Sequence, residues 1–403
     1  MIKIDGGVCA PHGFKANGVH CGIRKNRTKR DLALIVSDVR AAAACVYTQN
    51  LVKGAPILVT KEHVADGYAQ AIVCNSGNAN TCNADGVQIA EGMCALVEKH
   101  TGIAAGDVVV ASTGVIGRPL SLEPIAEHMD ELAAGLGAYS AEAAQAIMTT
   151  DTVEKQIAYS FMLGGKECRI GAIGKGVGMI NPNMATMLVF VTTDAAISHE
   201  MLQKALSANV KDTFNMVSVD GDTSTNDMVC VLANGQAGNE PVTGTGKEYN
   251  IFRKALFKVM EYLCRCIAKD GEGATKLLEC KVSGAKSKSV AKTVAKSVIK
   301  SALFKSAMFG ADANWGRVLC AVGYAGADVD VNKVDVSFRS RAGEIEVCSK
   351  GSGVPFSEEE AKRVLSEDEI EVLISLNSGS GRATAWGCDL TYEYVRINGD
   401  YRT

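Results

Sequence analysis

Short apolar runs typical of strands alternate along this chain with amphipathic patterns typical of helices. The strand-like runs cover residues 32–36, 57–59, 71–74, 108–111, 187–191 and 229–232, and residues 390–397 alternate strongly between apolar and polar side chains. Residues 247–268 repeat apolar side chains at helical spacing, and Ser121, Ser140 and Ser198 suit helix starts. Together these patterns predict a mixed α/β or α+β fold.

The composition is that of an ordinary globular protein. The 403 residues are 47% hydrophobic and 22% charged, with a net charge of -3. This balance does not predict a nucleic-acid surface. The N-terminal residues lack the apolar stretch of a secretory signal, and no run reaches the roughly 18 to 20 apolar residues that span a bilayer. We therefore expect no membrane partner, and the cytoplasm as the location.

Cysteine and histidine usage argues against metal and disulfide chemistry. The 14 cysteines form no C-x-x-C pair, so we expect small buried hydrophobic residues rather than disulfides or zinc ligands. All six histidines lie in the first half of the chain. We expect no metal site, and a nucleophile in the second half would have no histidine nearby in the sequence to serve as its base.

A glycine-rich segment with one proline, GKGVGMINPNM at residues 174–184, comes directly before an apolar run that begins at Met187. Its glycines allow backbone angles that other residues avoid, and its proline fixes one φ angle. Thr186 thus lies where a turn meets a predicted central strand, a placement that suits a nucleophile. The segment fits neither the P-loop nor the dinucleotide-binding pattern, so we do not expect a nucleotide site there.

Three further polar segments allow two interpretations each. NSGNAN (75–80) and STGVIG (112–117) follow strand-like runs, where folds hold catalytic groups, although plain turns have the same composition. DGDTSTND (220–227) offers metal-type ligands, but the same residue types cap helices and close turns. We favour the turn for this third segment.

Eight motifs occur in an order that resembles one known family. They are NSGNAN (75–80), STGVIG (112–117), TTDT (149–152), GKGVGMINPNMATM (174–187), DGDTSTND (220–227), DGEGATK (270–276), ANWGR (313–317) and RINGDYRT (396–403). In this order they resemble the ornithine acetyltransferase family of arginine biosynthesis, over essentially the full length. The resemblance implies layered sheets with flanking helices, similar to the DmpA/ornithine acetyltransferase fold of the N-terminal-nucleophile type.

The resemblance also implies that the chain cuts itself between Ala185 and Thr186. Residues 1–185 would form an alpha chain and residues 186–403 a beta chain, and the two would make one intertwined catalytic unit. Thr186 would attack the Ala185 carbonyl and form an ester that water hydrolyses. The freed α-amino group, with an unperturbed pKa of about 7.7 to 8.0, would then be the general base for the Thr186 hydroxyl.

By the same resemblance, the enzyme moves the acetyl group of N2-acetylornithine to L-glutamate through an acetyl-Thr186 intermediate. Thr113 and Gly114 match the family's oxyanion hole, which supplies donors to the tetrahedral intermediates. The family's substrate-binding positions match Thr152, Lys175, Thr186, Glu272, Asn398 and Thr403. A cation such as Lys175 suits a carboxylate, and an anion such as Glu272 suits an ammonium group.

The implied partners are small molecules and further copies of the same protein. We expect no bound cofactor, with acetyl-CoA as an optional second acetyl donor, and an assembly of two alpha and two beta chains. Two alternatives stay open: an N-terminal-nucleophile aminopeptidase or amidohydrolase that hydrolyses the acyl-threonine, and a non-enzymatic amino-acid-binding protein that never matures. Transfer to glutamate without net acetate release separates the acetyltransferase from the aminopeptidase.

Overall fold

The computed structural model describes residues 1–180 and 187–400, which divide into two compact units. Within the described residues, the first unit comprises 1–176, 187–211 and 223–263, and the second comprises 177–180, 212–222 and 264–400. Each unit thus contains residues from both sides of the expected cleavage position. The division into chains 1–185 and 186–403 stays a prediction.

The first unit is built on a mixed nine-stranded sheet. Its path runs β1-β6-β7-β8-β10-β3-β4-β5, with β2 paired to β3. The strands are β1 (Ile2–Ile4), β2 (Phe14–Val19), β3 (Leu32–Tyr47), β4 (Tyr68–Asn78), β5 (Val108–Val115), β6 (Lys155–Leu163), β7 (Lys166–Lys175), β8 (Leu188–Thr193) and β10 (Met228–Ala233). The pairs β4–β5 and β8–β10 are parallel. Because β3 pairs with β2 and β4 through its first half and with β10 through its second, the sheet bends into two halves.

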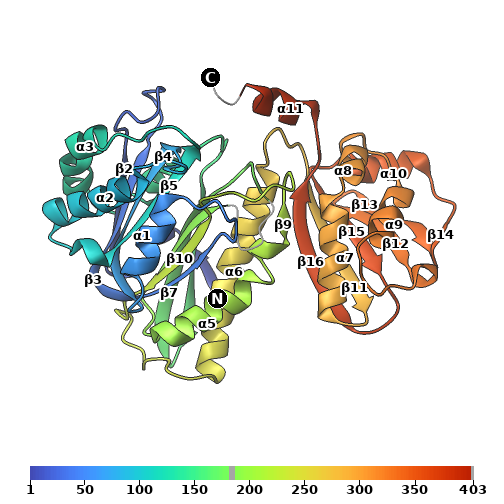
Figure 1. The fold of residues 1–403 in the computed structure, drawn as a ribbon. Coiled ribbons are helices and arrows are strands. Elements are labelled where there is room, and N and C mark those ends of the chain that lie inside the picture. Colours follow the sequence, from blue (N-terminus) through green and yellow to red (C-terminus); the bar gives the residue numbers. More distant parts are fainter. Residues whose placement is uncertain (181–186, 401–403) are drawn as a thin grey trace. The chain divides into compact units, whose positions relative to one another are not determined.

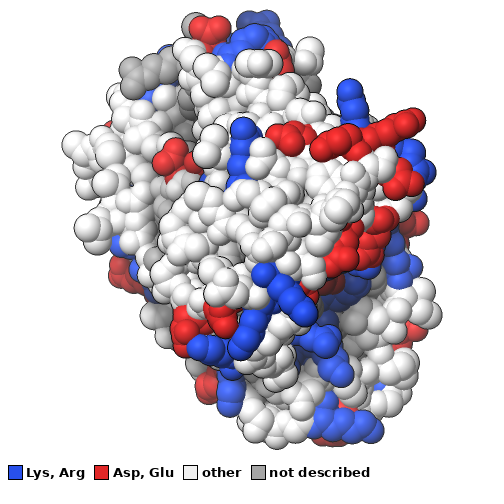
Figure 2. Space-filling model, turned by 90° about the vertical axis from the view of Figure 1, so that its right-hand side faces the viewer, with Lys and Arg blue, Asp and Glu red and all other residues white. Residues whose placement is uncertain are grey.

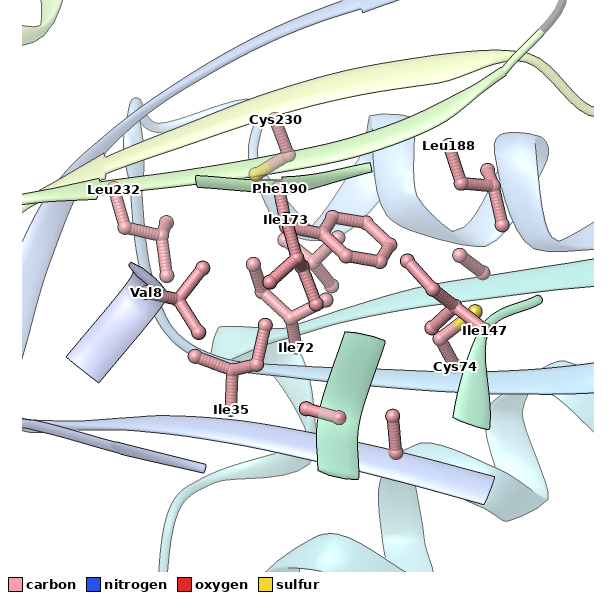
Figure 3. Close-up of a cluster of buried hydrophobic side chains, with 14 of the residues drawn as sticks. Val8, Ile35, Ile72, Cys74, Ile147, Ile173, Leu188, Phe190, Cys230 and Leu232 are labelled. Atoms are coloured by element: carbon pink, nitrogen blue, oxygen red, sulfur yellow. The ribbon is translucent and has the colours of Figure 1, made fainter. Parts of the chain in front are cut away.

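A hydrophobic core fills the space between the two halves of this sheet. Figure 3 shows Ile35 and Ile72 on one side and Ile173, Phe190 and Cys230 on the other, with their side chains gathered between the strands. All five are at most 1% exposed. Burial on this scale is the main stabilising contribution to the unit.

Helices cover the outer faces of both halves. The helices are α1 (Ala55–His63), α2 (Gly86–Thr101), α3 (Glu123–Ala134), α4 (Ser140–Ala146), α5 (His199–Val210) and α6 (Lys247–Lys269), with short 3-10 turns η1 (Gly7–Cys9) and η2 (Ala105–Asp107). Met93 of α2 and Met129 of α3 pack in a second core with Leu34 and Val110. Helices α5 and α6 lie along the other half (Figure 1). The predicted mixed α/β fold with layered sheets and flanking helices is therefore confirmed.

The second unit holds a seven-stranded sheet with helices packed on it. Its strand order is β14-β13-β12-β15-β11-β16-β9. These strands are β9 (Val217–Ser218), β11 (Leu277–Ala285), β12 (Asp335–Ser340), β13 (Gly343–Ser349), β14 (Ser352–Gly353), β15 (Glu369–Ser375) and β16 (Gly381–Cys388). The helices are α7 (Lys288–Lys300), α8 (Ala302–Phe309), α9 (Trp315–Gly323), α10 (Glu358–Leu365) and α11 (Tyr392–Gly399), with η3 (Phe214–Met216) and η4 (Val331–Lys333). Helix α7 packs on β11 and β16, and α10 packs on β12 and β13.

Most predicted elements are confirmed, with boundary shifts. The runs at 32–36, 71–74, 108–111, 187–191 and 229–232 lie in or overlap β3, β4, β5, β8 and β10. The helix expected over 247–268 is α6. Ser198 caps α5, since its side chain accepts the Met201 N–H, and Ser140 is the first residue of α4 rather than its cap.

Two strand predictions are wrong. Residues 57–59 lie in helix α1, which begins after Gly54 with Pro56 in its first turn, a position where proline favours helix. Residues 390–397 lie largely in helix α11, where the Thr391 side chain accepts the Glu393 N–H. The strand of this region is β16, which ends at Cys388 just before it. No helix in residues 1–180 and 187–400 is long and apolar enough to cross a membrane.

Candidate active site

The Thr113–Gly114 pair lies inside strand β5, beside the matching polar residues of β4. In the parallel ladder, Thr113 is opposite Ser76 and Gly114 is opposite Gly77, and the register shifts at Asn78. Gly114 has a φ of 134°, and a Cβ added there would meet the Gly77 backbone and lie 2.5 Å from the Asn78 nitrogen. Only glycine fits such a position. The first four residues of each polar segment, 75–78 and 112–115, therefore lie in β4 and β5, and only the last two residues of each follow the strand, which corrects the expectation that both whole segments follow their strands.

Asn226 ties these two strand ends together. Its side-chain amide donates hydrogen bonds to the Ala79 carbonyl at 2.5 Å and the Ser112 carbonyl at 3.0 Å. Its side-chain oxygen accepts a hydrogen bond from the Thr81 hydroxyl at 2.6 Å. A single buried side chain thus fixes the backbone directly before Thr113 against the end of β4. This rigidity suits a residue such as Thr113 that is expected to donate a hydrogen bond to the negative charge that develops in the transition state.

The turn predicted for DGDTSTND forms at its start. The Asp220 carboxylate accepts N–H groups from Met179 at 2.6 Å, Ile180 at 2.9 Å and Asp222 at 3.1 Å. Within the described part of the chain, no group of three or more His, Cys, Asp or Glu side chains is arranged to hold a metal ion. The later residues of the segment, from Thr225 to Asp227, are buried instead of exposed at a turn.

Lys175 is the last residue of β7 and lies among buried charges. Asp151, from the TTDT turn, is fully buried and accepts a hydrogen bond from the Lys155 ammonium at 2.7 Å. The same carboxylate accepts N–H groups from Gly176 at 2.9 Å and Thr149 at 3.0 Å. Asp151 therefore joins the TTDT turn to the end of β7, directly after Lys175.

These charges set the protonation of the cluster. Burial lowers the pKa of Lys175 below its ordinary value, and the nearby carboxylates of Asp151 and Asp227 oppose that shift only in part. Burial raises the pKa of Asp151, but Lys155 and Lys175 outweigh it, so the net pKa is lowered. Among residues 1–180 and 187–400, Lys175 forms no ion pair within 4.0 Å.

Thr152 is exposed at the end of the TTDT turn, next in sequence to the buried Asp151. Thr150 is half-buried in the same turn. The structure therefore gives the choice of Thr152 over Thr150 no further support, and the role of Thr152 stays a prediction.

In the second unit, Glu272 and Asn398 are brought together. Glu272 is 8% exposed, and its carboxylate accepts a hydrogen bond from the Asn398 side-chain amide at 2.8 Å. Its backbone N–H donates to the Val177 carbonyl at 3.0 Å. A Cβ on Gly178 would lie 2.6 Å from a Glu272 carboxylate oxygen, so glycine is required for this approach. Glu272 and Asn398, which are 126 positions apart in sequence, are thus joined by a hydrogen bond.

Three predicted site residues lie outside the described residues. These are Ala185 and Thr186 at the expected cleavage position, and Thr403 at the end of the chain. The first described residue after Thr186 is Met187, which is 1% exposed and directly precedes β8. The assigned roles of all the predicted site residues stay predictions.

A separate cavity of about 500 Å³ lies on the second unit and contains none of the predicted site residues. Charged side chains line it and pair with one another: Arg265 with Glu369 at 2.8 Å, and Arg339 with Glu371. Figure 2 likewise shows Lys and Arg side chains lying beside Asp and Glu side chains on one face of the molecule. Among the arginines that line the cavity, Arg265, Arg339 and Arg341 are each paired with a glutamate.

Sequence reasoning missed Asp151, Asn226 and Asp227 as members of the site region. Each lies in a motif that the sequence already marked, but the motif gave no sign of which side chain is buried. Which of these side chains is buried depends on packing against strands β4, β5, β7 and β8, which come from distant parts of the sequence.

Comparison with known proteins identifies the class of molecule. Residues 15–403 match the ArgJ family. The arginine biosynthesis bifunctional protein ArgJ 1 of Clostridium acetobutylicum is 50% identical over 392 residues, covering 97% of this chain and 96% of that protein. The arginine biosynthesis bifunctional protein ArgJ of Bacillus subtilis is 45% identical over 408 residues, covering 100% and 98%.

A solved structure agrees with this result. The crystal structure of the arginine biosynthesis bifunctional protein from Bacillus halodurans has a TM-score of 0.51 and 50% identity, covering 53% of this chain and 99% of that chain. The protein is therefore an acyltransferase of arginine biosynthesis. More particularly, the chain belongs to the ArgJ family.

Proposed function

We propose that the protein transfers the acetyl group of N2-acetylornithine to L-glutamate. The observation that carries the proposal is Lys175, whose ammonium has no ion-pair partner among the described residues although it lies in a largely buried charge cluster. Donor and acceptor both carry an α-carboxylate, which such a cation would bind. The bifunctional ArgJ relatives support the same reaction.

The reaction proceeds in two balanced steps. The Thr186 hydroxyl attacks the acetyl carbonyl of N2-acetylornithine, its proton passes to the Thr186 α-amino group, and that proton leaves with the ornithine nitrogen as the C–N bond breaks. The α-amino nitrogen of glutamate then attacks the acetyl ester, and its proton passes through the Thr186 α-amino group to the threonine oxygen as that oxygen leaves. The products are ornithine and N-acetylglutamate, and the enzyme returns to its starting state.

Thr113 and Gly114 supply the oxyanion donors in this mechanism, through a hydroxyl and a backbone N–H. Two observations support this role: β4 and β5 are paired at Thr113 and Gly114, and Asn226 donates a hydrogen bond to the Ser112 carbonyl directly before them. Donors that are already in place need no reorganisation when the charge develops, which is the usual source of the rate gain.

The remaining predicted residues bind the rest of the substrates. Glu272, held by Asn398, suits the side-chain ammonium of the ornithine group. Thr152, Asn398 and Thr403 orient the other polar atoms.

The active form arises by cleavage between Ala185 and Thr186, and two alpha and two beta chains assemble in the cytoplasm. The solved Bacillus halodurans chain supports cleavage, because 99% of it matches only 53% of this chain, about the share that residues 186–403 make up. Acetyl-CoA is a second acetyl donor, as the bifunctional relatives suggest. No bound cofactor takes part in either step.

The test is an assay with N2-acetylornithine and isotopically labelled glutamate. The proposal expects one labelled N-acetylglutamate for each ornithine released, with no net acetate. Release of acetate in step with ornithine, whether or not glutamate is present, would instead support the aminopeptidase or amidohydrolase alternative.

A further inference from the structure

The loop that carries Glu272 is anchored at its far end by a buried aspartate. Asp389, directly after β16, is 3% exposed. Its carboxylate accepts the N–H groups of Thr275 at 2.8 Å and Lys276 at 3.0 Å, and the Thr275 hydroxyl at 2.5 Å. The Lys276 ammonium donates to backbone carbonyl groups in the last turns of α8 and α10. The loop 270–276 is therefore fixed on the side that leads into β11.

Thr391 joins the middle of this loop to helix α11. It is 7% exposed, and its hydroxyl donates a hydrogen bond to the Gly273 carbonyl at 2.6 Å. The same hydroxyl oxygen accepts the Glu393 N–H at 3.2 Å and so caps the helix. A Cβ on Gly273 would lie 2.7 Å from the Tyr394 nitrogen, so the loop and the first turn of α11 are in direct contact.

Helix α11 carries Asn398 near its other end, about two helical turns from Thr391. The Asn398 amide donates to the Glu272 carboxylate at 2.8 Å, and Glu272 directly precedes Gly273. Hydrogen bonds at the two ends of α11 thus hold two neighbouring residues of one loop. The contacts close a ring that starts at Glu272, crosses to α11 through Thr391 and returns through Asn398.

Helix capping alone does not account for the contacts of the Thr391 hydroxyl. A cap needs only the hydrogen bond from the Glu393 N–H, and the bond to the Gly273 carbonyl is additional. That second bond is made to the residue beside Glu272. The hydroxyl therefore fixes how this part of the loop approaches α11.

We propose that Thr391 is a positioning residue that sets the donor specificity of acetyl transfer: its hydroxyl holds the Glu272 loop against α11, so that the Glu272 carboxylate stays beside Asn398 and binds the side-chain ammonium of the ornithine group. The inference rests on the proposed function, in which Glu272 binds that ammonium. A carboxylate that is already held in place binds a cation without a further ordering cost. Selection of a donor with a side-chain ammonium therefore depends on the Thr391 hydroxyl.

The experiment measures kcat/KM for two acetyl donors, N2-acetylornithine and N2-acetylnorvaline, which has the same carbon chain without the side-chain ammonium. Wild type should prefer N2-acetylornithine about 10- to 100-fold, as one hydrogen bond between charged groups provides. Thr391→Val keeps the branched shape and removes the hydroxyl. It should reduce this preference about fivefold or more, because kcat/KM falls for N2-acetylornithine and stays within about twofold for N2-acetylnorvaline.

Matched variants separate the hydroxyl from the shape of the side chain. Thr391→Ser keeps the hydroxyl and should keep the wild-type preference. Thr391→Ala removes the hydroxyl without placing a methyl group against the Gly273 carbonyl, and it replaces Thr391→Val if that variant does not fold. Thr384→Val makes the same chemical change at a half-buried threonine of β16 and should behave as wild type. Because both donors are measured with one preparation, the preference does not depend on the fraction of folded or cut enzyme.

A double-mutant cycle with Glu272→Gln shows whether Thr391 acts through Glu272. Glu272→Gln should by itself remove most of the preference, and adding Thr391→Val should then change it by less than about twofold. A second, additive loss in the double variant would overturn the inference, because Thr391 would then act on the substrate by another route.

Each remaining outcome decides one point. A wild-type preference in folded Thr391→Val and Thr391→Ala, or an equal fall for both donors, overturns the inference alone. Loss of the preference in Thr391→Ser shows that the hydroxyl is not its cause and overturns the inference too. An unchanged preference in Glu272→Gln refutes the assignment of Glu272 and the inference with it. A wild type that transfers acetyl from neither donor to glutamate refutes the proposed function itself.

Discussion

Replacing Lys175 with methionine tests whether this ammonium binds the substrate carboxylate. Methionine keeps much of the apolar stem and removes the charge. A hydrogen bond to a charged group contributes about 1.5 to 3 kcal/mol, and about 1.4 kcal/mol corresponds to a factor of ten. We therefore expect kcat/KM for both substrates to fall about 10- to 100-fold. The two values should fall together, since the donor and the acceptor share the carboxylate contact.

The pH dependence gives this prediction a second readout. Burial lowers the pKa of Lys175, so its ammonium is lost at a lower pH than that of an ordinary lysine. Carboxylate binding needs the protonated form. The wild-type kcat/KM should thus decline as pH rises through this lowered pKa, and Lys175→Met should lack that decline.

The matched control is Lys166→Met, at the exposed first residue of the same strand. It should keep wild-type kcat/KM and the same decline at high pH. The assay is steady-state transfer from N2-acetylornithine to glutamate at varied pH, with thermal unfolding to confirm folding. A folded Lys175→Met enzyme with unchanged kcat/KM would refute the assignment of Lys175.

Three further changes probe other parts of the account. Thr113→Ala should lower kcat about 10²- to 10³-fold, the usual loss for one oxyanion donor, with little change in KM; near-normal turnover would remove Thr113 from the mechanism. Thr186→Ala should leave one uncut chain by intact mass, and cleavage before residue 186 in that variant would exclude the hydroxyl as the attacking group. Asp151→Asn breaks the buried ion pair between Asp151 and Lys155, which are 2.7 Å apart, and should reduce the free energy of unfolding by about 3 kcal/mol at pH 7. Because the pKa of Asp151 is lowered, this difference should be full above the unfolded pKa near 3.8 and shrink as pH falls through the folded value; a constant difference in urea unfolding would contradict the pairing.

The sequence predicted elements well where pattern and local signals agreed. Residues 247–268 have a clear apolar face and form α6. Residues 57–59 are apolar, and Ile57 and Val59 are β-branched, but the preceding Pro56 favours a helix start, and the helix forms. Residues 390–397 alternate like a strand, yet the Thr391 cap and the Arg396–Glu393 ion pair at 2.5 Å accompany a helix. Short apolar runs are ambiguous because periodicity over so few residues cannot separate the two structures.

The sequence marked the motifs of the candidate site, whose roles stay predictions, but it did not mark the buried side chains that surround them. The pairing of Thr113 and Gly114 with the end of β4 follows from two strands that motifs already marked. The burial of Asp151 and Asp227 does not, because it depends on chain segments far away in the sequence. Asp220 and Asp227 occur in one motif, yet Asp220 closes a turn, whereas Asp227 is buried directly before β10, with one carboxylate oxygen that has no hydrogen-bond partner among the described residues. Only the three-dimensional packing separates these roles.

Intact-mass analysis of the cut protein before and after addition of N2-acetylornithine tests the central claim, acetyl transfer through Thr186. Without glutamate, the fragment 186–403 should gain the mass of one acetyl group while the fragment 1–185 stays unchanged. Adding glutamate should restore the original mass and yield N-acetylglutamate, which distinguishes the reactive ester on Thr186 from a stable amide on its amino group. An enzyme that transfers acetyl while neither fragment ever carries it, with initial-rate lines that intersect instead of running parallel, would contradict the covalent mechanism.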